Sequence, residues 1–219
     1  MAENRRIAGL KKREIGVILK DLAILIDTNC ELSDQAKYDI IYKMAWEWTE
    51  GRTTATKYYG CKYWSEKALK EKFPESKIAC GETIEYDRKD EKDLRHEHVV
   101  PKKLFMEWVW YMLKNPNQFN SDEFKNVIEN NLVACVVTKE EDSNLIKDKL
   151  PIELNSECTY VNDFECIKYP WARYKIAQDK GEMTTIYELE WCEGKKAIVK
   201  GIVDTSKEVE LSKSLNAPK

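Results

Sequence analysis

Arg95-His96-Glu97-His98-Val99-Val100-Pro101 is the stretch from which we predict the fold, because it carries both histidines of the chain within three residues. An imidazole takes up and returns a proton near neutral pH, and it is also a common metal ligand. Glu97 adds a carboxylate between the two rings, and Pro101 ends the extended segment. The stretch therefore indicates a chemical site or, as the plainer alternative, the polar end of a strand that faces water.

The segment that follows is predicted to be a helix over residues 101–114. Apolar side chains occur on nearly all of its faces, which is typical of a helix in the core. Trp108 and Trp110 also admit a second interpretation, in which their rings form a platform on which nucleic-acid bases stack.

A second informative stretch begins with the apolar run over residues 132–137, which predicts the clearest strand in the chain. Thr138, with Glu141 three residues later, forms a capping box, so a helix is expected to start directly after the strand. Asp142 and Asn144 then fall in the opening turns of that helix, where a carboxylate or an amide can be aimed at a cation.

These two stretches carry a resemblance to a known family. Glu97-His98-Val99-Val100-Pro101 followed by Val136-Val137-Thr138-Lys139-Glu140-Glu141 resembles the HNH, or ββα-metal, endonuclease superfamily over residues 94–150. Trp171-Ala172-Arg173-Tyr174 is similar to a third, outlying part of one HNH-like branch. The resemblance implies a core of two strands and a helix that holds a divalent cation and hydrolyses DNA.

Taken residue by residue, the resemblance makes His98 the general base that deprotonates the attacking water. It makes Glu97 the first metal ligand and Asp142 the last, with Asn144 in reserve. Asp142 stands where related sequences usually have His or Asn. Because a carboxylate suits a hard cation, Mg²⁺ or Mn²⁺ is the expected cofactor.

Strand alternation decides which residue accompanies His98. On a straight strand His96 and His98 share one face and Glu97 lies on the other, so Glu97 joins the site only if the chain bends near residues 99–101. If the strand stays straight, His96 accompanies His98 as a metal ligand or as a phosphate contact.

Basic residues near these motifs are candidates for gripping the backbone of a nucleic acid. The candidates are Arg95, Lys102, Lys103 and Arg173. Ordinary surface charge is the alternative for all four, and a structural salt bridge is a further alternative for Arg173.

Working outward, we predict an α+β protein in three parts. They are a helical N-terminal region over residues 1–75, a ββα-metal core over residues 76–150 with the helix 101–114 inserted, and a C-terminal α/β cap over residues 151–219.

Further elements are expected in the two outer parts. Ser33 is a predicted cap of the second N-terminal helix, and residues 61–69 are predicted to belong to a third. In the cap, residues 184–191 and 196–203 are expected to form a pair of strands, or a helix and a strand.

Composition narrows the class of protein. The 219 residues are 42% hydrophobic and 34% charged with a net charge of −3, which is typical of a globular chain without the basic surplus of many nucleic-acid binders. No apolar run reaches the roughly 18–20 residues of a membrane span, and the N-terminus lacks the apolar core of a signal peptide, so a cytoplasmic location is expected. The seven cysteines include no CxxC pair, which disfavours a zinc ribbon.

Two functional hypotheses follow. The first is a metal-dependent HNH-like endonuclease acting on DNA, with His98 as base and with Glu97 and Asp142 holding the cation. The alternative is a non-catalytic module that binds nucleic acid or protein on an HNH-like scaffold. Action as a single copy and action as a homodimer that cuts both strands are both left open.

Overall fold

The computed structural model describes residues 31–49, 58–87, 91–115, 121–145, 169–192 and 195–207. Its helices are α2 (Asp34–Thr49), α3 (Glu66–Lys72), α4 (Lys102–Lys114), α5 (Ser121–Asn131), α6 (Lys139–Asn144) and α7 (Ala172–Asp179). Its strands are β1 (Tyr63–Ser65), β2 (Thr83–Glu85), β3 (Leu94–His98), β4 (Ala134–Thr138), β5 (Ile186–Cys192) and β6 (Lys196–Ile202).

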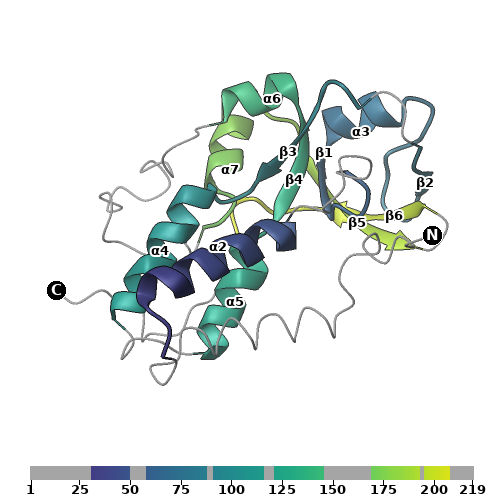
Figure 1. The fold of residues 1–219 in the computed structure, drawn as a ribbon. Helices are drawn as coiled ribbons and strands as arrows, with labels where there is room; N and C mark the ends of the chain where they lie inside the picture. The colour runs from purple at the N-terminus through teal and green to yellow at the C-terminus, as the bar shows by residue number, and fades with distance from the viewer. Residues whose placement is uncertain are drawn as a thin grey trace, which may run out of the picture.

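The strands form one six-stranded sheet in the order β2-β6-β5-β1-β4-β3. β1 and β4 are parallel, and the other neighbours pair antiparallel. Figure 1 shows α2, α4 and α5 gathered at one end of the molecule and the β2, β5 and β6 part of the sheet at the other. The fold is therefore α+β, as predicted.

Segments that are distant in the sequence meet in this sheet. β1 comes from the range predicted as the N-terminal region, β3 and β4 from the predicted core, and β5 and β6 from the predicted cap. Because β1 lies between β4 and β5, the three predicted parts are joined through backbone hydrogen bonds.

Each face of the sheet buries its own apolar cluster, because side chains alternate along a strand. Trp64 and Val136 point to the face that also packs Leu69 of α3. Cys135 and Val137 belong to the cluster that includes Tyr174 of α7. The strand β4 is buried along its whole length, which explains its continuous apolar sequence.

Several predicted elements are confirmed. The helix predicted over residues 101–114 is α4, and the predicted strand after residue 132 is β4. The Ser33 hydroxyl accepts a hydrogen bond from the Ala36 amide at 3.2 Å, as expected of a helix cap. The C-terminal pair of strands is present as β5 and β6.

The helix predicted over residues 61–69 is wrong in its first half. Residues Tyr63–Ser65 form β1, which pairs with β4 on one side and with β5 on the other. The helix begins only at Glu66, where the Ser65 hydroxyl accepts from the Ala68 amide at 3.1 Å. Burial of Trp64 between two strands outweighs the local helical pattern.

The predicted helix before residue 31 lies outside the described residues. Within the described ranges, no helix is both long enough and apolar enough to cross a membrane.

Candidate functional site

The histidines lie on β3, which is an edge strand of the sheet. β3 pairs with β4 in an unbroken antiparallel register from Leu94 opposite Thr138 to His98 opposite Ala134. The strand is therefore straight as far as His98. The chain does bend after it, at Val99 and Val100, as expected, but this bend leaves Glu97 and His98 on opposite faces of the strand.

A straight strand brings the two imidazoles together. The ring centres of His96 and His98 are 6.1 Å apart, and the ring planes are nearly perpendicular, at 87°. His96 is buried, with 8% of its surface exposed, whereas His98 is partly exposed. His98 is therefore the ring that a substrate can reach more easily.

Glu97 points to the opposite face of the sheet, where it meets Arg173 of α7. The Arg173 Nη2 atom lies 2.6 Å from Oε1 of Glu97. The same guanidinium donates from Nε to the Val99 carbonyl at 2.9 Å and from Nη2 to the His98 carbonyl. Since Arg173 is only 1% exposed, the Glu97 carboxylate serves as the partner of a buried cation.

Asp142 and Asn144 lie on α6, which starts at the other end of the strand pair. The Lys139 amide donates to the Asp93 carbonyl at 2.8 Å, so α6 begins beside the start of β3. His98 is the last residue of β3 and therefore lies at the other end of the strand. The four residue steps from Leu94 to His98 span about 13 Å along a strand. The Asn144 side-chain amide donates to the Glu182 carbonyl at 3.3 Å.

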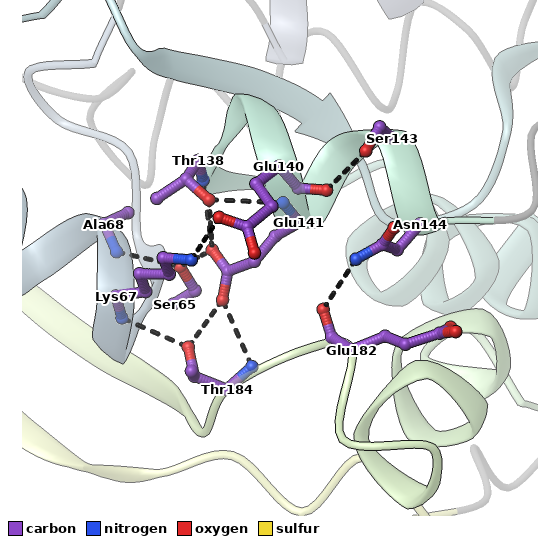
Figure 2. Close-up of polar contacts among 10 residues, drawn as sticks. All are labelled: Ser65, Lys67, Ala68, Thr138, Glu140, Glu141, Ser143, Asn144, Glu182 and Thr184. Atoms are coloured by element: carbon purple, nitrogen blue, oxygen red, sulfur yellow. Dashed lines mark hydrogen bonds and ion pairs between the residues drawn. The ribbon is translucent and has the colours of Figure 1, made fainter.

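The carboxylate that anchors α6 is Glu141, which is 2% exposed. Figure 2 shows it between Thr138, Ser65 and Thr184. Its Oε2 accepts from the Thr138 amide at 3.0 Å and from the Ser65 hydroxyl at 2.5 Å, and its Oε1 accepts from the Thr184 amide at 3.1 Å and hydroxyl at 2.5 Å. The capping box predicted the contact with Thr138, but no local signal indicated Ser65 or Thr184.

The residues present do not fit the Mg²⁺ or Mn²⁺ site that the resemblance implies. Glu97 and His98 lie on opposite faces of β3, and α6 begins at the far end from His98. Among the described residues, no group of three or more His, Cys, Asp or Glu side chains is arranged to hold a metal ion.

The predicted phosphate contacts differ in their surroundings. Arg95 is partly buried, and its Nη1 donates to the Leu94 carbonyl at 2.8 Å. The Lys102 Nζ atom lies 3.5 Å from the centre of the Tyr42 ring. Lys103 is exposed, with its Nζ atom 4.0 Å from Glu107. Lys103 is thus the most accessible of the three, whereas Arg173 would have to leave Glu97 to contact a phosphate.

Two cysteines lie near this site, Cys135 on β4 and Cys61 just before β1. Burial raises the pKa of the Cys61 thiol to about 12 and raises the pKa of Cys135 well above its usual value. Both side chains are therefore neutral thiols at physiological pH, which is unsuited to a nucleophile or a metal ligand.

Comparison of the chain with protein-family models, with curated proteins and with solved structures found no match.

Proposed function

We propose that this protein is an HNH-like endonuclease that hydrolyses phosphodiester bonds of DNA, with His98 as the general base. The observation that carries the proposal is the pairing of the chain's two imidazoles on one face of β3, with ring centres 6.1 Å apart. The antiparallel pair of β3 and β4 and the helix α6 that follows β4 also support it, because a ββα core has these three elements, here with α4 and α5 inserted between the two strands.

In this proposal His98 takes the proton of the attacking water as the water adds to phosphorus. His96 donates a proton to the leaving 3′ oxygen as its bond to phosphorus breaks. Two imidazoles at this spacing suit one phosphate between them, because each acting nitrogen must come within about 3 Å of the oxygen it serves.

No step is assigned to a metal ion, because Glu97 is held by Arg173 and α6 starts at the opposite end of the strand pair. Charge on the phosphate would instead be met by cationic side chains close to His98 in the sequence. Lys103 is the accessible candidate and Arg95 is the next one, whereas the Lys102 Nζ atom is buried.

The test is nicking of supercoiled plasmid by the wild-type protein and by His98→Ala, each with Mn²⁺, with Mg²⁺ and with EDTA. We expect the wild type to convert plasmid to nicked or linear DNA in all three conditions, EDTA included, since no step needs a metal ion, and we expect His98→Ala to leave the plasmid intact. Glu190→Ala, a change at an exposed position of β5, is the matched control and should cut like the wild type. A wild type that leaves plasmid, linear and single-stranded DNA intact while a known nuclease cuts them would refute the proposal.

A second candidate is a nucleic-acid- or protein-binding module without catalysis. The ion pair between Glu97 and Arg173 favours it, because it gives a structural use to the carboxylate that the resemblance makes a metal ligand. Binding of plasmid in a gel-shift assay, with no cutting in any metal condition, would support this candidate over the nuclease.

A further inference from the structure

The two imidazoles of β3 form a pair of proton-transfer groups without a carboxylate between them. Their ring centres lie 6.1 Å apart with the ring planes nearly perpendicular. Glu97, which separates them in the sequence, lies on the opposite face of the strand beside Arg173. The Nδ1 atom of His96 is buried, so Nε2 is the ring nitrogen through which His96 can serve a substrate. The pair therefore offers one base and one acid.

A base and an acid suit one kind of phosphodiester better than another. A positioned acid or base accelerates a reaction by about 10²–10⁴-fold, but it supplies no nucleophile. In RNA the 2′ hydroxyl group is a nucleophile next to the phosphorus atom, and well-oriented intramolecular reactions reach effective molarities of about 10⁵ M or more. In DNA the same pair must also bring in and orient a water molecule. RNA is therefore the substrate for which moving protons contributes most.

We propose that the His96–His98 pair also cleaves single-stranded RNA without a metal ion, through the 2′ hydroxyl group of the substrate. The inference rests on the proposed function, because it uses the same base and acid, and it adds RNA to the substrates.

The step needs only the substrate and the two imidazoles. His98 takes the proton of the 2′ hydroxyl group as the 2′ oxygen bonds to phosphorus. The bond between phosphorus and the 5′ oxygen breaks, and His96 donates the proton that this oxygen takes up. The products are a 2′,3′-cyclic phosphate and a 5′ hydroxyl group, and both imidazoles return to their starting forms by exchanging protons with water.

An unpaired strand suits this step better than a duplex. The attacking 2′ oxygen and the leaving 5′ oxygen must lie on opposite sides of phosphorus, and an unpaired backbone has the freedom to reach that arrangement.

The experiment uses a fluorescent single-stranded DNA oligonucleotide that carries one ribonucleotide at its centre, incubated with the full chain in EDTA. We expect a cut after the ribonucleotide at least about 100-fold faster than at any deoxynucleotide. Mass spectrometry should find a 2′,3′-cyclic phosphate at the new end. A 2′-O-methyl group in place of the 2′ hydroxyl group should abolish this fast cut, because it blocks the nucleophile.

Variants assign the two roles. His98→Asn and His96→Asn should each slow the fast cut by about 100-fold or more. Replacing the leaving 5′ oxygen by sulfur separates the roles, because a thiolate leaves without taking up a proton. On the sulfur substrate His96→Asn should cut within about tenfold of the wild type, whereas His98→Asn should stay slow.

Glu190→Ala, at an exposed position of β5, is the matched control and should cut both substrates like the wild type. Thermal melting checks that each variant is folded. His96 is buried, whereas His98 is partly exposed. If His96→Asn does not fold, the cyclic phosphate and the loss of cutting in His98→Asn still test the proposal.

Three results would each overturn the inference. They are a ribonucleotide cut no faster than its deoxynucleotide neighbours, new ends without a cyclic phosphate at the earliest times, and an equally fast cut by folded His98→Asn.

The two proposals can fail separately. If the wild type nicks plasmid and the ribonucleotide gives no faster cut, the RNA inference fails and the DNA endonuclease stands. If the ribonucleotide is cut through a cyclic phosphate while plasmid stays intact, the DNA endonuclease fails and the RNA inference stands.

Discussion

Arg173, which is buried, and Glu97, which is partly exposed, form an ion pair that links α7 to the edge strand β3 across 76 residues of sequence. The guanidinium also donates to the His98 and Val99 carbonyls, so one side chain holds the end of β3 and the start of the path into α4. Glu97, expected as a metal ligand, and Arg173, expected as a phosphate contact, thus have a structural role in holding this part of the fold together.

Glu97→Ala should lower the free energy of unfolding by about 3 kcal/mol, because it leaves the Arg173 cation buried without its partner. Glu97→Gln should cost less, since its amide oxygen still accepts a hydrogen bond. Urea denaturation of the three proteins measures the effect. Unchanged stability in Glu97→Ala would mean that the carboxylate does not stabilise the fold through Arg173 and is available for another role.

Glu141→Ala should lower the free energy of unfolding by about 3 kcal/mol, because it leaves donors of Ser65, Thr138 and Thr184 without their hydrogen-bond acceptor. The neighbouring Glu140 is exposed, and its contact is an ion pair with Lys67. Glu140→Ala is therefore the matched control and should change stability by no more than about 0.5 kcal/mol. Equal losses in the two variants would contradict the network drawn in Figure 2.

Asp142→Ala should nick plasmid within about twofold of the wild type, since α6 begins at the end of the strand pair opposite to His98. The resemblance predicts the contrary, a loss of cutting together with a loss of Mn²⁺ stabilisation. Nicking rates and melting temperatures with and without Mn²⁺ separate the two. A folded Asp142→Ala that fails to cut would restore the metal-ligand role.

Cys61 and Cys135 should resist alkylation at pH 8, because burial raises the pKa of each thiol, that of Cys61 to about 12. Of the cysteines in the described ranges, Cys80 and Cys192 are exposed and should react before Cys61 and Cys135. Mass spectrometry of the native protein after timed iodoacetamide treatment checks the order. Rapid labelling of Cys61 in the folded protein would contradict the raised pKa of its thiol.

The same raised pKa makes stability depend on pH. The Cys61 thiol ionises near pH 9 in the unfolded chain but only near 12 in the folded one, so its contribution is complete below pH 9 and is lost as the pH rises through that window. The free energy of unfolding of the wild type, measured by denaturation, should fall more steeply between pH 9 and 10 than that of Cys61→Ala. Parallel pH profiles for the two proteins would count against this assignment.

Local sequence determined the elements whose signals are complete within a few residues. The capping box of Thr138 and Glu141, the apolar run of β4 and the helix after Pro101 were predictable, because backbone preference and side-chain caps act over three or four positions. The alternation of β3 likewise predicted that His96, not Glu97, would share a face with His98 on a straight strand.

Only the tertiary structure decided what depends on partners distant in the chain. Residues 63–65 became a strand because β4 and β5 flank them, and Glu97 found its partner in Arg173. The reach of Glu141 to Ser65 and Thr184 has the same origin. Strand pairing and buried polar contacts gain their free energy from groups brought together by folding, so no local pattern could have specified them.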